Sequence, residues 1–315
     1  MLYVTTRNDR EACTAQRAMT ENRGPEGGLY LPFHQPQFSK EELDELLALS
    51  PNACMAQILN LLFRQQITGW DIDLSVGRKP VRLESLGQKL FAAELWHNPQ
   101  WNYGAFVAGL SQCLGAEPSA DWVRIAVGIG VVFALCGQLH QHGIPQADMA
   151  VVAGDFSMAS SIWYARQWGA PVGSIVCACN ENNGLWDLIC HGQLRTDSRS
   201  IDTGLPCADV ALPVDLERLV YGCGGVGEVA RYLDCCRRGK TYLPSETVQR
   251  RMGQGLSVSV VSSQRLEDTI SGVEKTCGYR LSRETALGYA GVLDYRAKTG
   301  RTGPAVILSQ TRPEI

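Results

Sequence analysis

The sequence lacks an excess of charge of either sign. Its 315 residues carry 29 lysines and arginines and 32 aspartates and glutamates, for a formal charge of −3 at pH 7. A protein that binds nucleic acid through the phosphate backbone needs clustered basic side chains that displace counterions. The basic clusters in this sequence are few and short, and residues 237–240 are an example. Nucleic acid is therefore not expected as a partner.

Long apolar runs and an N-terminal signal pattern are also missing. The most apolar stretch, residues 125–136, is about a dozen residues long, whereas a membrane-spanning helix needs roughly 20. It is predicted to be a buried helix, and no membrane contact is expected. Residues 1–7 have no apolar signal core and no small-residue cleavage site, so the twelve cysteines are expected to be reduced thiols in a cytoplasmic protein.

The cysteines and histidines lack the spacing of zinc ligands. Structural zinc sites usually combine pairs of the form C-x2-4-C or H-x3-5-H. The nearest pairs here are too close together, namely Cys177 and Cys179, Cys190 and His191, Cys235 and Cys236, and His140 and His142. No metal site is predicted, and most cysteines are expected to be buried as small apolar side chains.

The composition does supply a large core, since 45% of the residues are hydrophobic and 19% are charged. Residues 1–80 are predicted to form a helical N-terminal domain. Within it, Ser39 and Glu42 have the spacing of a capping box at a helix start. A second helix is expected over residues 53–64, with Thr68-Gly69 ending it.

From residue 81 onward, short apolar runs alternate with helical patterns, which is typical of a mainly parallel sheet covered on both faces. Residues 81–315 are therefore predicted to form a three-layer α/β domain. The expected strands are residues 90–95, 149–153, 172–177, 256–261 and 305–309. The expected helices are residues 122–140, 158–168, 227–237 and 283–298.

Residues 222–227 match the dinucleotide-binding pattern G-x-G-x-x-G, which works when the glycines follow a strand and open a helix. Here the preceding residues 215–220 have a helical pattern, and no clear strand-helix-strand unit surrounds them. The glycines are therefore interpreted as a loop between two helices.

A strand-turn-helix-strand pattern covers residues 149–179, and such a turn can present helix N-terminal amides to an anion. Its residues 154–157, together with residues 179–183 after the second strand, resemble the G-N-F-G and A-T-N-E-N-D stretches of threonine synthases. Further segments resemble that family in the same order: residues 25–32 (P-D-G-G-L-F-V-P), 94–99 (E-L-F-H-G-P), 122–125 (W-A-R-I), 213–219 (P-S-N-F-E-R-L) and 285–286 (within P-H-T-A).

This resemblance to threonine synthases covers nearly the whole chain. It implies a fold-type II, tryptophan synthase β-like fold, and a family that converts O-phosphohomoserine to threonine with pyridoxal phosphate (PLP). That chemistry needs a lysine to hold the cofactor. The family's lysine lies in H-G-P-T-L-A-F-K-D, and against residues 97–105 it falls on Gly104. None of the other lysines lies in a matching motif, so PLP is expected to be lost and no catalytic residue is assigned.

Other positions that hold the cofactor in the family are also altered. In the phosphate turn, the family's asparagine is Asp155 and its second glycine is Ser157, which sets a carboxylate beside the place of a phosphate. The family's threonine at the pyridine nitrogen corresponds to Gln310 or, with an offset, to Thr311. The family's small mobile domain is largely missing and is reduced to residues 106–121. The candidate residues of the residual cleft are His97, Asn98, Gly154, Asp155, Phe156, Ser157, Asn180 and Gln310.

These losses together predict a pseudoenzyme that binds a protein partner, as a homo- or hetero-oligomer, or a small-molecule ligand. The alternative is an enzyme, lyase-like if active, with PLP-independent or noncovalent-PLP chemistry on a small amino acid or phosphorylated substrate. Asp155 is then the candidate base and Cys179 the candidate nucleophile. The spacing of these residues selects no reaction class, and Asp155 and Ser157 equally suit capping of the following helix.

Overall fold

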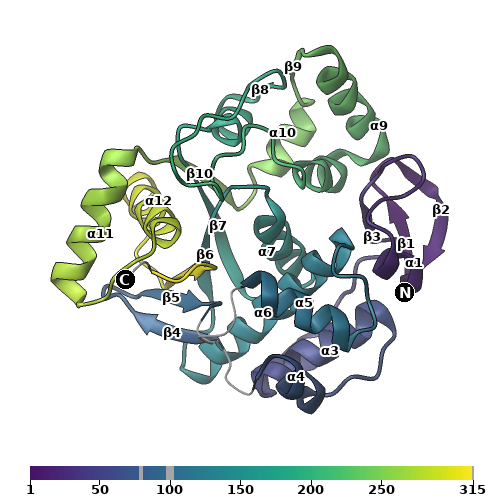
Figure 1. Ribbon diagram of the computed structural model, residues 1–315, viewed down its shortest axis with the longest axis horizontal. Helices are drawn as coiled ribbons and strands as arrows, with labels where there is room; N and C mark the ends of the chain where they lie inside the picture. The colour runs from purple at the N-terminus through teal and green to yellow at the C-terminus, as the bar shows by residue number, and fades with distance from the viewer. Residues whose placement is uncertain (78–80, 97–102, 314–315) are drawn as a thin grey trace. The chain divides into compact units, whose positions relative to one another are not determined.

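The computed structural model describes residues 1–77, 81–96 and 103–313. The chain forms two compact units, and Figure 1 shows the helices and strands that belong to them. Unit 1 comprises Met1–Val81, Asn98–Gln146 and Ser160–Val172, and unit 2 comprises Arg82–His97, Ala147–Ala159 and Gly173–Ile315. Each unit is thus assembled from three segments, whereas the predicted domains were two consecutive stretches. The division at residue 80 stays a prediction.

Unit 1 begins with a small antiparallel sheet that the sequence did not predict. Strands β1 (Leu2–Thr5), β2 (Asn8–Thr14) and β3 (Tyr30–Pro32) are arranged in the order β2-β1-β3. The description of the N-terminal part as helical was therefore incomplete. Strand β2 is mostly exposed and rich in charge, so it lacks the alternation of buried and exposed residues that identifies a half-buried strand.

The rest of unit 1 is helical: α1 (Ala15–Thr20), α2 (Lys40–Ala48), α3 (Pro51–Phe63), α4 (Gly69–Val76), α5 (Tyr103–Cys113) and α6 (Asp121–Gln141). The predicted capping box is confirmed, since Ser39 Oγ accepts from the Glu42 amide at 3.2 Å and the Ser39 amide donates to Glu42 Oε2 at 2.8 Å. Thr68 does not end α3; it caps the start of α4 by the same reciprocal arrangement with Asp71.

Helix α6 is the helix expected over residues 122–140, and it contains the apolar stretch 125–136 that was predicted to be buried. It is long and apolar enough to cross a membrane by length and composition alone, but 94% of the apolar window is buried inside the protein. A core helix with neighbours on all sides has this composition. Helices α2 and α3 both pack against it, so α6 forms part of the core of unit 1.

Unit 2 is built on a six-stranded sheet with the order β10-β7-β6-β11-β5-β4. The five predicted strands are confirmed as β5 (Leu90–Glu94), β6 (Ala147–Val152), β7 (Val172–Cys179), β10 (Leu256–Val260) and β11 (Ala305–Ser309). The sheet is mostly parallel, as expected, with an antiparallel edge strand β4 (Arg82–Ser85) that the sequence did not indicate.

Helices and short strands complete unit 2. Helices α11 and α12 pack against each other, and α12 contacts β6, β10 and β11 (Figure 1). One of the points where the chain passes between the two units falls within α7, whose residues from Ser160 onward belong to unit 1. The remaining elements are α7 (Ser157–Gln167), α8 (Gly184–Trp186), the π-helix η1 (Asp187–His191), β8 (Leu194–Arg195), α9 (Leu216–Arg238), β9 (Thr241–Tyr242), α10 (Glu246–Met252), α11 (Ser263–Cys277) and α12 (Arg283–Thr299).

The glycine-rich residues 222–227 lie inside α9 and do not follow a strand. Gly225 has φ +70° and ψ −172°, so two helical segments meet there at a break. This backbone conformation is essentially restricted to glycine. The interpretation as a glycine break between two helices is confirmed, and the dinucleotide pattern has no structural basis.

Candidate functional site

The carboxyl ends of three adjacent strands bring most of the predicted cleft residues together in unit 2. Residues 154–157 follow β6, Asn180 follows β7 and Gln310 follows β11, and these strands are neighbours in the sheet. The Ala153 amide donates to the Ala178 carbonyl near the end of β7 at 2.9 Å. Strands β6 and β7 therefore end at the same edge. His97 and Asn98 lie outside the described residues.

The turn after β6 has a strained and tightly packed backbone. Gly154 has φ +43°, and a Cβ atom there would lie 2.5 Å from the Cys207 carbonyl oxygen, so only glycine fits. Phe156 has φ +69° and a buried side chain. Such conformations persist only where the surroundings enforce them, and they are concentrated at functional sites.

The Asp155 carboxylate binds donors at the start of α7. Its Oδ1 atom accepts a hydrogen bond from the Ser157 amide at 3.0 Å and another from the Ser157 hydroxyl at 2.7 Å. Amides at a helix N-terminus favour a negative charge. In this chain a built-in carboxylate supplies that charge at the place where the threonine synthase resemblance implies a phosphate.

A second acidic residue, Asp215, joins this turn to the start of α9. The Asp215 amide donates to the Asp155 carbonyl at 3.0 Å. The Asp215 carboxylate forms an ion pair with the fully buried Arg218. A buried cation is stable when an anion neutralises it, so Arg218 already has a counter-ion from its own chain.

Asn180 binds the segment after β8. Its amide nitrogen donates to Thr203 Oγ1 at 2.8 Å and to Asp209 Oδ1 at 2.6 Å. Although partial desolvation opposes ionisation, hydrogen bonds from Thr203, Asn180 and Leu205 hold the pKa of Asp209 below its usual value. The buried Asn180 thus has its donors engaged in holding residues 203–209.

A closed cluster of hydroxyl groups occupies the ends of β5 and β11. Thr285 Oγ1 lies 2.6 Å from Ser309 Oγ and 2.7 Å from Ser282 Oγ. Trp96 Nε1 donates to Ser309 Oγ at 2.9 Å, and Thr311 Oγ1 lies 3.2 Å from Ser282 Oγ. Every member of this hydroxyl cluster therefore has a partner within the cluster.

Glu284 lies beside the hydroxyl cluster and is 3% exposed. It accepts a hydrogen bond from Thr311 Oγ1 at 2.6 Å and from the backbone amides of Thr311 and Gln310. Burial is the larger effect and raises the pKa of Glu284 to about 7. The half-buried Gln310 thus contributes its backbone to this contact.

Gly104, at the position of the family lysine, lies in the first turn of α5 in unit 1 and is exposed. The lysines among the described residues are also exposed, and Lys89 lies at the amino end of β5, away from the strand ends that carry the turn. Lys79 is outside the described residues. The remaining lysines are Lys40, Lys240, Lys275 and Lys298.

Cys179, the candidate nucleophile, is 2% exposed. Burial raises the pKa of its thiol to about 12. Because the thiolate is the reactive form, this environment does not favour a nucleophile. Across the described part of the chain, no group of three or more histidine, cysteine, aspartate or glutamate side chains is placed to hold a metal ion.

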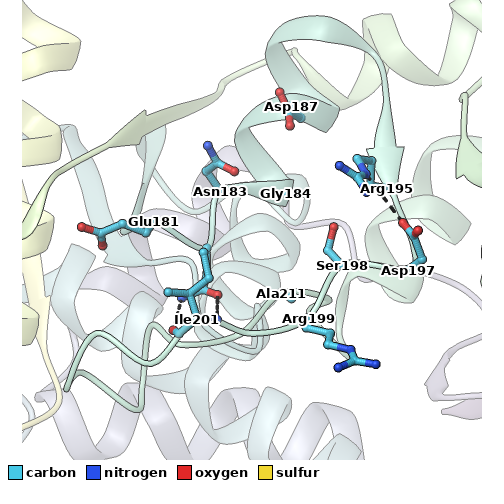
Figure 2. A pocket seen from close by; sticks show the side chains of 11 residues that line it. Glu181, Asn183, Gly184, Asp187, Arg195, Asp197, Ser198, Arg199, Ile201 and Ala211 are labelled. Atoms are coloured by element: carbon cyan, nitrogen blue, oxygen red, sulfur yellow. Dashed lines mark hydrogen bonds and ion pairs between the residues drawn. The ribbon is translucent and has the colours of Figure 1, made fainter.

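A polar cavity that the sequence did not predict lies beside residues 181–187. Asp187, Arg195, Asp197 and Ser198 are among its lining residues (Figure 2). Their only signal in the sequence is a polar segment without periodicity. Polar residues of this kind are typical of exposed loops, so the sequence alone could not distinguish them as a site.

Comparison with known proteins agrees with this architecture. Residues 2–78 match the family described as threonine synthase N terminus. Threonine synthase of Pseudomonas aeruginosa is 28% identical over 208 residues, which cover 64% of this chain and 42% of that protein. Threonine synthase of Methylobacillus glycogenes is 27% identical over 114 residues, which cover 36% of this chain and 24% of that protein. The chain thus aligns with less than half the length of these curated relatives.

Two solved structures resemble the fold over nearly the whole chain. PLP-bound threonine synthase from Brucella melitensis has a TM-score of 0.84 at 18% identity, covering 99% of this chain and 89% of that one. Yeast threonine synthase has a TM-score of 0.85 at 15% identity, with 99% and 87% covered. The fold is therefore that of the fold-type II PLP enzymes. Within that class, the chain is threonine synthase-like, as its motifs indicated.

Proposed function

We propose that this threonine synthase-like chain is a pseudoenzyme that binds a ligand or a protein partner and does not perform PLP-dependent catalysis. The observation that carries the proposal is that the Asp155 carboxylate accepts hydrogen bonds from the amide and the hydroxyl of Ser157. It acts together with Gly104, which offers no amine at the lysine position.

The residues present do not fit PLP. At the turn, a phosphate would lie beside a carboxylate, and like charges about 4 Å apart repel by roughly 4 kcal/mol at an effective dielectric of 20. Asp155 already uses donors that a phosphate would need. At the end of β11, the hydroxyl cluster satisfies its own hydrogen bonds. The same argument disfavours noncovalent binding of PLP.

Different chemistry in the same cleft has little support from the candidate groups. The Cys179 thiol is buried with a raised pKa. One oxygen of the Asp155 carboxylate already accepts two hydrogen bonds from Ser157. Neither group meets the requirement that a catalytic base or nucleophile reach the reacting atom in a suitable protonation state.

Oligomerisation forms part of the proposal. Three large apolar side chains of α3 and α4 are exposed: Leu61 at 40%, Trp70 at 54% and Leu74 at 70%. Helices α3 and α4 pack against each other, and apolar side chains exposed on neighbouring helices are expected to be covered by a partner when they form one patch. Light scattering of the purified protein at increasing concentration is expected to show a homodimer or a larger assembly, and a monomer at every concentration would contradict homo-oligomerisation.

The proposal is tested by an activity assay with added PLP. Purified protein is incubated with excess PLP and O-phosphohomoserine, and release of inorganic phosphate and formation of threonine are measured. A threonine synthase serves as the positive control. The expected result is no phosphate release above that of the heat-denatured protein. PLP-dependent release with matching threonine formation would overturn the proposal.

A further inference from the structure

A cavity of about 430 Å³ in unit 2 is lined by residues that directly follow the predicted cleft residue Asn180. One wall consists of residues 181–187 after β7, and the other consists of residues 195–201 (Figure 2). Small-molecule sites usually have volumes of roughly 300 to 1,000 Å³, so the cavity has room for a small metabolite. Neither the turn after β6 nor Gln310 is among its lining residues.

The two walls are fixed to each other before any ligand binds. The buried Asn182 donates to the Ile201 carbonyl at 2.9 Å, and the Ile201 amide donates to Asn182 Oδ1 at 2.7 Å. Asn182 also contacts Asn180 and Asp209. A preformed site loses less conformational entropy on binding than a flexible one.

The charged groups of the cavity have both signs. Arg195 and Asp187 are both accessible, with 71% and 33% of their side chains exposed. Arg195 Nε lies 3.6 Å from Asp197 Oδ1, and Asp187 Oδ1 lies 3.0 Å from His191 Nδ1. Asp187 also begins the π-helix η1, and π-helical turns are frequent at functional sites.

The other charged lining residues are directed elsewhere. Glu181 Oε1 accepts from the Ser263 amide at 3.3 Å and from its hydroxyl at 3.0 Å. In Figure 2 the side chains of Glu181 and Arg199 extend away from the group formed by Asn183, Asp187, Arg195 and Ser198. The charges that face a ligand are therefore those of Asp187, Arg195 and Asp197.

Two neutral polar groups of the cavity have no hydrogen-bond partner in the described part of the chain. They are the side-chain amide of Asn183 and the hydroxyl of Ser198, and both line the cavity. Each can donate and accept a hydrogen bond. They can therefore orient a polar ligand between the charged groups.

We propose that this cavity binds a small zwitterion, with an anionic group at Arg195 and Ser198 and an ammonium group at Asp187. A ligand with only negative charge would face Asp187 and Asp197, which is unfavourable, and one with only positive charge would leave Arg195 and Ser198 without a ligand group. The α-amino acids have the required charges and size. This inference rests on the proposed function insofar as that function is ligand binding.

The test uses the full-length protein and the twenty standard L-amino acids as probes, added singly in a thermal-shift assay and followed by calorimetry. For each amino acid that binds, the N-acetyl derivative lacks the ammonium charge and the carboxamide lacks the carboxylate. We expect at least one amino acid to bind saturably. We also expect each derivative to bind about tenfold more weakly or worse, because a charge-assisted hydrogen bond is lost.

Two substitutions test whether the ligand binds in the cavity. Arg195→Gln and Asp187→Asn are each expected to weaken binding by about tenfold or more. Arg237→Gln is the matched control, since Arg237 is 75% exposed and lies 3.5 Å from Asp234 in a comparable ion pair. It is expected to leave binding unchanged.

The inference is overturned if no amino acid binds, if both derivatives bind as tightly as the parent, or if neither cavity variant weakens binding. These results are independent of the phosphate-release assay. A catalytically inactive protein that fails to bind amino acids would contradict only the present inference. An active protein would contradict the pseudoenzyme proposal whatever the binding result.

Discussion

Asp155 binds donors at the start of α7, and under the proposed function it also disfavours a bound phosphate. Asp155→Ala removes the acceptor for the Ser157 amide and hydroxyl, so it is expected to lower the free energy of unfolding by about 1 kcal/mol, the usual effect of losing a capping side chain. Asp155→Asn keeps an acceptor oxygen and is expected to cost less. Urea denaturation at neutral pH measures both values.

The control for Asp155 is Asp44→Ala, at an exposed position of α2. It is expected to change the free energy of unfolding by no more than about 0.5 kcal/mol, as is typical of surface substitutions. If Asp155→Ala behaved like this control, the carboxylate would not be bound at the start of α7 as the structure describes.

The raised pKa of Glu284 predicts that the stability of the fold depends on pH. Burial raises its pKa from 4.5 to about 7, so the folded state holds a proton that the unfolded state releases between these pH values. The stability contributed by protonated Glu284 is fully present below about pH 4.5 and is lost as pH rises to about 7. The loss is of the order of 3 kcal/mol, from the size of the pKa shift.

Glu284→Gln isolates this effect, because glutamine is neutral at every pH in the range. Relative to the variant, the wild-type protein is expected to lose stability between pH 5 and pH 8 in urea denaturation. The groups that face Glu284 are the hydroxyl of Thr311, the amides of Gln310 and Thr311, and the Cys207 thiol. Glu274→Gln, on the exposed side of α11, is the control. A parallel pH profile for wild type and Glu284→Gln would contradict the raised pKa.

The break in α9 can be tested with a pair of glycines in one helix. Gly225 has φ +70° and Gly227 lies in the helical segment after the break, and a Cβ at either position would meet no atom within 4 Å. Gly225→Ala is therefore destabilising for backbone reasons alone, by about 1 to 3 kcal/mol. Gly227→Ala is expected to stabilise by up to about 1 kcal/mol.

Thermal and urea unfolding of the two glycine variants provide the measurement. Equal effects of the two substitutions would show that α9 is continuous through Gly225. The comparison is internal to one element, so differences in burial between distant sites do not enter it.

Elements with strong apolar periodicity were predictable from the sequence, and elements without it were not. Strands β5, β6, β7, β10 and β11 are short apolar runs between helices, and each was expected near its observed bounds. Strands β2 and β4 were missed because their charged, largely exposed residues resemble loop. Strands β1 and β3 are mostly buried but have only four and three residues, too few to show a periodic pattern. Helix α4 was missed because its capping residue Thr68 was interpreted as the end of the preceding helix.

For the whole molecule, the resemblance to threonine synthases predicted the fold and the place of the turn, but not the contacts there. The substitution by Asp155 could be read from the sequence, whereas its bond to Ser157 depends on the backbone of the turn. The cavity depends on the chain folding back through η1 and β8, which brings Asp187 and Arg195 onto facing walls. No spacing in the sequence encodes that approach.

In the proposed pseudoenzyme, none of the lysines among the described residues is placed to capture PLP. The most direct measurement is incubation with one equivalent of PLP, followed by borohydride reduction, intact-protein mass spectrometry and peptide mapping of all six lysines, Lys79 included. We expect no absorbance band at roughly 410 to 430 nm, where lysine-bound PLP absorbs, and no stoichiometric adduct. One lysine labelled in full by one equivalent of PLP would contradict it.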